Sequence, residues 1–283
     1  MRNNSTYYKK ITSVHKPFDL HLDEVWQYRD LIVLFTKRNF ITRYKQTVLG
    51  PAWLFINPII SSLIYCFIFG GIAGISTGSV PQMLFYLTGN AIWTFFSGCV
   101  TRNASTFTAN ASVFGKVYFP RLTTPMSNVL TGILEFFIQM VMVIFFLIYY
   151  LSQGTVYPNW EFLLLIPIIL LELGIMGMGV GIIISSLTTK YRDLSILVGF
   201  AIQLWMYVTP VVYPLSQAGT GKLRTILLLN PVTAPTEVYR YAILGEGELI
   251  PVAIMWSVAF TTVVALIGIV IFNKVEKTFM DTV

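Results

Sequence analysis

The sequence predicts an all-α membrane protein with six transmembrane helices per subunit, an N-terminal interfacial amphipathic helix and short re-entrant helices between spans five and six. Three observations support this fold class. The 283-residue chain is 55% hydrophobic and only 11% charged, its mean hydropathy is +0.70, and its apolar residues gather in long stretches. Soluble domains carry about 25% charged residues, so we expect a lipid bilayer to surround most of this chain.

Six apolar stretches are long enough to cross a membrane, because about 20 helical residues at about 1.5 Å each span a hydrocarbon core of about 30 Å. Each span must be a helix, since lipid offers no hydrogen-bond partner to an open backbone. An even number of spans puts both termini on the same side. The predicted spans cover residues 52–73, 83–105, 127–151, 162–187, 194–214 and 251–273.

The positions of Lys and Arg predict that both termini are cytoplasmic, because loops on that side of a membrane are enriched in these residues. With this orientation, the short outer loops near 74–82 and 152–160 contain neither Lys nor Arg. The outer side holds only Lys222, Arg224 and Arg240. We therefore expect a multi-pass membrane protein. No secretory signal peptide is expected at the N-terminus.

Residues 1–50 form a predicted cytoplasmic arm, and its part from Asp23 to Tyr44 is the expected interfacial helix. Its apolar side chains anchor it at the membrane surface, although its cations do not keep to one face. Cations beside a membrane span can hold an anionic headgroup. Four of them lead directly into the first span: Lys37, Arg38, Arg43 and Lys45.

Residues 51–283 form the predicted six-span transmembrane domain, which also contains two longer connections. Residues 106–126 are a cytoplasmic loop between spans two and three. Residues 215–250 lie on the outer side and are too apolar for a plain loop but too short for two spans. We predict short helices that dip back toward the membrane, which is tolerated where protein or a cavity covers the backbone.

No residue pattern indicates catalysis, a cofactor or a metal site. The Gly-Lys pairs at 115–116 and 221–222 lack the Ser or Thr that follows in a phosphate-binding loop. His15 and His21 are isolated from any second metal ligand. The net charge of +6 is explained by membrane orientation, so no nucleic-acid binding is expected. The chain alone is therefore not predicted to be an enzyme.

Two acidic residues, Glu135 and Glu172, fall within predicted spans, and such acids are functional candidates. Neither has an obvious cationic partner in a span, so each could also be a protonated or hydrogen-bonded carboxyl between packed helices. Arg102 lies near the inner end of span two and can extend its charge to the surface. A proton-coupled secondary carrier would use both acids, but the inverted repeats of many such carriers are absent.

Aromatic residues make up 15% of the chain. Many are expected in interface belts or against lipid, whereas others could line a channel by stacking on the C–H faces of sugars. The candidates for such a channel wall are Phe95, Phe96, Trp205 and Tyr207. In span four, Gly177 and Gly181 have the spacing at which small residues let two helices approach closely.

Three motifs carry a resemblance to a known family: RYKQTVLGPAWLFINP at 43–58, NASVFGKVYFPRLTTP at 110–125 and LNPVTAPTEVYRYAILG at 229–245, with YRDL at 191–194 as a weaker fourth. They resemble the membrane permeases of ABC polysaccharide exporters, which move lipid-linked O-antigen, capsule or teichoic acid chains. The resemblance extends from about Val25 to Lys277. It implies a homodimer with two copies of a separate ABC ATPase, which would bind ATP and Mg²⁺, and an undecaprenyl-pyrophosphate-linked glycan as substrate, with O-antigen expected first.

The resemblance also assigns roles along the chain. The substrate headgroup and cytoplasmic gate would involve Arg38, Arg43, Tyr44, Lys45, Leu49 and Gly50. Coupling to the ATPase would involve Phe114, Gly115, Lys116, Val117, Tyr118, Phe119 and Pro120. The outer gate would involve Asn230, Pro231, Glu237, Tyr239 and Arg240. A small-molecule exporter fits the three motifs less well, and a passive channel would need a filter that the sequence does not show.

Overall fold

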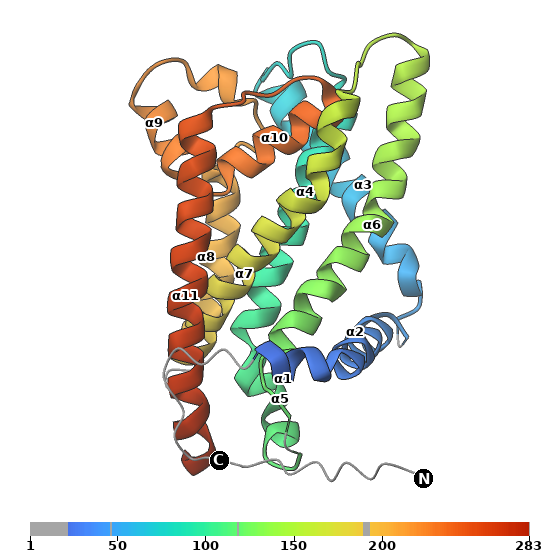
Figure 1. The fold of residues 1–283 in the computed structure, drawn as a ribbon. Coiled ribbons are helices and arrows are strands. Elements are labelled where there is room, and N and C mark those ends of the chain that lie inside the picture. Colours follow the sequence, from blue (N-terminus) through green and yellow to red (C-terminus); the bar gives the residue numbers. More distant parts are fainter. Residues whose placement is uncertain (1–21, 46, 118, 189–192, 283) are drawn as a thin grey trace, which may run out of the picture.

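A computed structural model describes residues 22–45, 47–117, 119–188 and 193–282, and in this part of the chain the fold is helical without a β-strand (Figure 1). The all-α class is therefore confirmed. Most helices run along a common bundle, whereas α1 and α2 lie across its lower end in Figure 1. The elements are α1 Leu22–Gln27, α2 Arg29–Tyr44, η1 Gly50–Ala52, α3 Trp53–Tyr65, η2 Cys66–Ile72, α4 Gln82–Ala104, α5 Thr106–Phe114, α6 Thr123–Ser152, η3 Trp160–Leu165, α7 Ile166–Thr188, α8 Leu194–Val208, η4 Leu215–Ala218, α9 Lys222–Leu229, α10 Thr233–Leu244 and α11 Pro251–Thr282.

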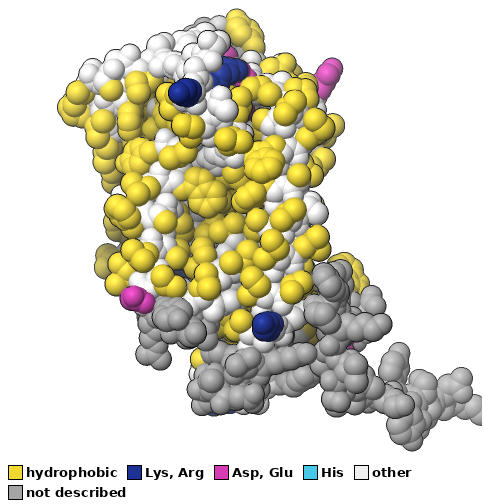
Figure 2. Space-filling view, turned by 90° about the vertical axis from the view of Figure 1, so that its left-hand side faces the viewer, with side chains coloured by type: hydrophobic (Ala, Val, Ile, Leu, Met, Phe, Trp, Pro, Cys, Tyr) yellow, Lys and Arg dark blue, Asp and Glu magenta, His cyan; other side chains and the backbone are white. Residues whose placement is uncertain are grey.

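Five helical segments among the described residues are long and apolar enough to cross a membrane: Gly50–Ile72, Gln82–Ala104, Thr123–Ser152, Trp160–Thr188 and Pro251–Val275. Figure 2 shows one face of the bundle, where hydrophobic side chains cover the middle and the visible charged side chains lie near the two ends. This distribution is the one that a bilayer requires. The chain is therefore a multi-pass membrane protein.

The sixth predicted span, 194–214, corresponds to α8, which has only 15 residues. At about 1.5 Å per residue, α8 is about 22 Å long and shorter than a typical hydrocarbon core. The helix ends at Val208 because Pro210 follows Thr209, and the residue before a proline favours the extended backbone that Thr209 adopts. The six-span count therefore stays a prediction. The short helices expected within 215–250 are present, but their depth in the membrane is also still a prediction.

Helix α4 is the centre of the bundle and packs against α3, α6 and α7. Its close contact with α7 depends on the glycines of α7, as the sequence predicts. A Cβ atom added to Gly177 would lie 2.8 Å from the Cβ of Cys99, and one added to Gly181 would lie 2.5 Å from the Cβ of Asn103. Both distances are shorter than any normal carbon contact, so the two helices could not approach this closely with larger residues.

We predict that Gly181→Ala lowers the free energy of unfolding by about 1–3 kcal/mol, because the added methyl group overpacks the α4–α7 contact. The measurement is the midpoint of thermal unfolding in detergent. Gly199→Ala is the matched control, because it makes the same change within a helix, α8, at a site where an added Cβ meets nothing within 4 Å. Equal unfolding midpoints for the two variants would contradict the proposed role of Gly181.

Candidate functional site

Helix α2 packs along α6 near the lower end of the bundle. Its buried face consists of Ile32, Phe35 and Thr36, while Leu34 and Ile41 are exposed. Exposed apolar side chains on a helix that lies across the end of a membrane bundle are suited to the lipid interface. The C-terminal end of this helix brings charged and phenolic groups to the side of α6.

The carboxylate of Glu135 on α6 is the centre of a cluster from three helices. Arg43 Nη1 of α2 donates to its Oε1 at 3.0 Å, and Arg102 Nη1 of α4 donates to its Oε2 at 2.8 Å. The Tyr44 hydroxyl also donates to Oε1 at 3.1 Å. Burial and the nearby Glu135 carboxylate raise the pKa of Tyr44 to about 12, so this phenol keeps the proton that it donates.

This cluster corrects two expectations about Glu135 and Arg102. The sequence suggested that Glu135 has no cationic partner in a span and that Arg102 extends to the surface, whereas Glu135 has two arginine partners and Arg102 is one of them. The Glu135 side chain is 9% exposed, and those of Arg102 and Arg43 are 17% and 54% exposed. Glu172, in contrast, accepts a hydrogen bond of 2.6 Å from Ser257.

A cavity of about 300 Å³ lies beside the cluster, and Arg43, Tyr44 and Glu135 form part of its wall. Its size is at the lower end of the range for small-molecule sites. The cavity also offers amide and hydroxyl groups, which can donate and accept hydrogen bonds. These come from Asn57, Ser61, Asn90, Thr94 and Gln139.

Of the predicted headgroup and gate residues, Arg43 and Tyr44 line the cavity, whereas Arg38, Lys45, Leu49 and Gly50 do not. The Arg38 guanidinium lies 4.7 Å from the centre of the Phe35 ring and donates to Asn110 of α5 at 3.5 Å. Arg102 and the polar residues of the cavity wall were missed as site residues. The sequence pointed to this place through Arg43 and Tyr44 and through the position of Glu135 inside a span.

Two aromatic residues of the predicted coupling segment lie inside the subunit. Phe114 and Phe119 are buried, and their ring centroids are 5.7 Å apart. Phe119 also contacts Phe35 of α2 at 5.5 Å, so aromatic packing joins α5 and α2. Gly115, Lys116 and Val117 are exposed, Pro120 is half-buried, and Tyr118 lies outside the described residues. Among the described residues of 114–120, the surface open to a partner is therefore the tip at 115–117.

The four predicted channel residues lie in two different environments. Phe95 and Phe96 are buried in the subunit core, because Phe95 packs on Phe136 at 5.9 Å and Phe96 packs edge-on against Trp205 at 5.2 Å. Trp205 is half-buried, and Tyr207 is exposed. The channel role stays a prediction, and a channel outside this subunit could reach Tyr207 but not Phe96.

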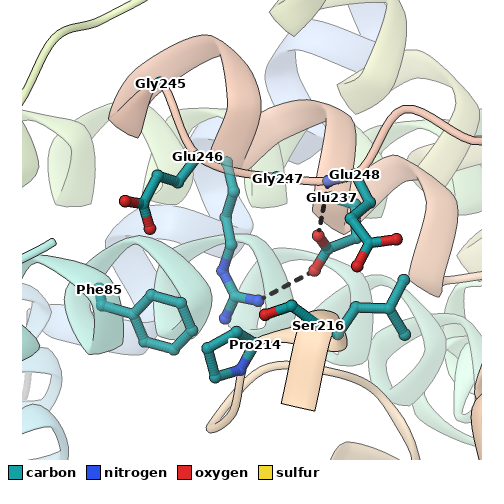
Figure 3. A pocket seen from close by; sticks show the side chains of 10 residues that line it. Phe85, Pro214, Ser216, Glu237, Gly245, Glu246, Gly247 and Glu248 are labelled. Atoms are coloured by element: carbon teal, nitrogen blue, oxygen red, sulfur yellow. Dashed lines mark hydrogen bonds and ion pairs between the residues drawn. The ribbon is translucent and has the colours of Figure 1, made fainter. Parts of the chain in front are cut away.

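At the opposite end of the bundle, the predicted outer gate residues form a buried network. Arg240 of α10 donates to the carbonyls of Pro210 and Val211 and to Glu237 Oε1. Its guanidinium also lies 4.0 Å from the centre of the Phe85 ring. Glu237 accepts the backbone N–H of Glu248 at 3.0 Å, beside a cavity of about 350 Å³ (Figure 3).

The remaining outer gate residues are held by the same region. Asn230 accepts a hydrogen bond from Trp205 Nε1 at 3.0 Å, and the Pro231 carbonyl accepts one from Ser257 of α11 at 2.7 Å. The hydroxyl of buried Tyr239 points to the sulfur of Met140 at 3.1 Å. These contacts fix α10 and its preceding turn against the rest of the bundle. Among the described residues, no cluster could hold a metal ion.

Comparison with known proteins gives matches over most of the chain. Residues 30–244 match the ABC-2 type transporter family. The O-antigen export system permease protein RfbA of Klebsiella pneumoniae is 32% identical over 254 residues, which cover 89% of this chain and 94% of that protein. RfbA of Myxococcus xanthus is 29% identical, covering 86% and 91%. The capsule polysaccharide export inner-membrane protein CtrC of Neisseria meningitidis is 22% identical, covering 91% and 97%.

We predict that Arg240→Met lowers the free energy of unfolding by about 3–5 kcal/mol, because it leaves the buried Glu237 carboxylate without its cation. Thermal unfolding in detergent measures the loss. Adding Glu237→Gln to this variant should restore part of it. Arg224→Met is the control, because the Arg224–Glu248 pair is more exposed and should contribute little. A loss at Arg224 as large as that at Arg240 would contradict this view of the network.

Proposed function

Since the chain belongs to the ABC-2 type transporter family, we propose that it is the permease subunit of an ATP-driven exporter of lipid-linked polysaccharide. The similarity to O-antigen and capsule export proteins over most of both chains supports this class of substrate. The structural observation that carries the proposal is the polar cavity beside Arg43 and Tyr44, at the end of the bundle where α2 lies across the spans.

The cavity offers a binding site for the charged part of such a substrate, an undecaprenyl-pyrophosphate-linked glycan. Arg43 is half-exposed and Tyr44 keeps its proton, so both can donate to phosphate oxygens. Charge-assisted hydrogen bonds from arginine to phosphate are among the stronger polar contacts. Arg38 and Lys45 lie outside the cavity and would attract the headgroup from the inner leaflet. The positions of Lys and Arg support the proposal that both termini are cytoplasmic.

Hydrolysis of ATP, with its Mg²⁺, would take place on a separate ABC ATPase, two copies of which would bind two copies of this chain. The exposed tip at 115–117 is the proposed contact with the ATPase. The Phe114–Phe119–Phe35 packing supports this assignment, because a push on the tip would reach α2 through rings in direct contact. In this proposal the permease itself carries no cofactor and is not an enzyme.

A second copy of the chain would complete the path for the glycan. Within α8, Met206 is the buried residue, and the exposed side chains include Ile196, Leu197 and Phe200. This short helix presents an apolar face that a homodimer could cover, with the glycan passing between the subunits. The glycan is proposed to be O-antigen, and capsule or teichoic acid chains are the alternatives within the same family.

We favour the exporter over a proton-coupled carrier that would use Glu135 and Glu172. A proton carrier needs an acid that can bind and release a proton during transport. Both carboxylate oxygens of Glu135 already accept hydrogen bonds, from Arg43 and Tyr44 on one oxygen and from Arg102 on the other. A proton path would then have to rely on Glu172 alone, which accepts a hydrogen bond from Ser257.

We predict that Arg43→Ala raises about 10- to 100-fold the glycan concentration that half-maximally stimulates ATP hydrolysis. The reason is that hydrogen bonds to charged groups contribute about 1.5–3 kcal/mol. The measurement uses the permease purified with its ATPase in lipid nanodiscs, with and without lipid-linked glycan. Lys37→Ala is the control, because it removes a cation from the same helix outside the cavity. An unchanged half-maximal glycan concentration in Arg43→Ala would contradict the headgroup role of Arg43. A permease that transports without the ATPase and with a proton gradient would overturn the proposed function.

A second prediction separates binding of the ATPase from transmission of its movement to α2. Val117→Asp should prevent assembly with the ATPase, because it puts a charge on an exposed apolar contact. Phe35→Ala should leave the complex assembled but lower export at a given rate of ATP hydrolysis, because it removes the ring that Phe119 contacts. Co-purification measures the first effect and export per ATP hydrolysed measures the second. Normal assembly in Val117→Asp would show that the tip is not the docking site.

A further inference from the structure

The two arginines beside the cavity are not equivalent partners of Glu135. The Arg102 side chain is mostly buried, and its Nε and Nη2 atoms find no oxygen acceptor among the described residues. Its guanidinium lies so close to α6 that a Cβ added to Gly132 would be 2.5 Å from Nη2. Arg102 therefore depends on the Glu135 carboxylate for compensation of its charge.

Arg43 is in the opposite situation. More than half of its side chain is exposed, and it lines the cavity, which Arg102 does not. An exposed ion pair is weak and easily exchanged, whereas a buried one is costly to break. If a stronger anion enters the cavity, Arg43 is the partner that can leave Glu135, while Arg102 keeps its hydrogen bond to the carboxylate.

The Glu135 carboxylate now occupies the donors that an incoming phosphate would use. Its Oε1 atom accepts from both Arg43 Nη1 and the Tyr44 hydroxyl. Among the described residues of the cavity wall, Arg43 and Glu135 are the ones with a formal charge. These donors are therefore already paired with an anion that belongs to the protein itself.

We propose that Glu135 is a positioning residue that acts as an internal competitor of the substrate's phosphate. It holds Arg43 and Tyr44 in place while the site is empty, and it weakens the binding of the lipid diphosphate so that the headgroup can be released after transport. This inference rests on the proposed function and adds a regulation of affinity to the same site. It implies that ligand binding exchanges one anion for another on Arg43 and frees the end of α2 from α6.

The experiment measures binding of a short prenyl diphosphate to the permease–ATPase complex in phosphatidylcholine nanodiscs, with the prenol of the same chain length as a blank. Glu135→Gln should bind the diphosphate about threefold to tenfold more tightly, because the competing carboxylate is gone. Its maximal diphosphate-stimulated ATPase rate should fall, because release becomes slower. Glu172→Gln is the matched control, an identical change in another span, and should leave both values as in the wild type.

A second variant keeps the test valid if Glu135→Gln does not fold with Arg102 left unpaired. Glu135→Gln combined with Arg102→Met removes the whole buried pair and keeps the formal charge of the cluster at +1. It should also bind the diphosphate more tightly than the wild type, which separates competition for donors from a change in net charge. Weaker binding in every folded variant would show that Glu135 only supports the donors and would overturn the inference.

Two further outcomes have different meanings. Failure of the wild type to bind the diphosphate above the prenol blank would overturn the proposed headgroup site itself. Binding by the wild type with equal affinity in Glu135→Gln would leave that site intact and overturn only the competitor role. Displacement of the diphosphate by equimolar phosphatidylglycerol would show that the cavity is a site for bulk anionic lipid, which also overturns the inference.

Discussion

A carboxylate within a membrane span must be compensated, and the lower half of this structure is arranged around that need. Glu135 is neutralised by Arg102 from a neighbouring span and by Arg43 from a helix outside the spans. The cost of leaving Glu135 or Arg102 alone in a low-dielectric region is high. The cluster therefore ties α2, α4 and α6 together, and it places the end of α2 beside a polar cavity instead of leaving it on the membrane surface.

Helix α4 connects this cluster to the opposite end of the bundle. It carries Arg102 near one end and Phe85, against which the Arg240 guanidinium lies, near the other. Between them, its backbone is in close contact with Gly177 and Gly181 of α7. The two polar networks thus meet the same closely packed helix, through Arg102 at one end and Phe85 at the other. Helices α2 and α8 lie around this centre and are more exposed.

Much of the fold follows from hydropathy, but the site follows only in part. The apolar stretches and the glycine pair of α7 are local signals, and the structure agrees with five of the six stretches and with the glycine pair. The partners of Glu135 could not be predicted, because Arg43 lies 92 residues away and reaches it only through the way α2 folds back on α6. The burial of Phe114 and Phe119 was equally hidden, since apolar residues in a loop can face a partner or their own core. The early end of α8 at Val208 could have been predicted from Pro210.

Helix α2 is fixed at two points, by Phe35 in the aromatic packing with Phe119 and by Arg43 on Glu135. These residues are about 12 Å apart along the helix axis, and each residue of an α-helix turns the next by about 100°. One residue inserted or deleted between positions 35 and 43 would rotate one anchor away from its partner while leaving the other in place. Relatives that use both anchors should therefore tolerate substitutions between these positions but not a change in their number.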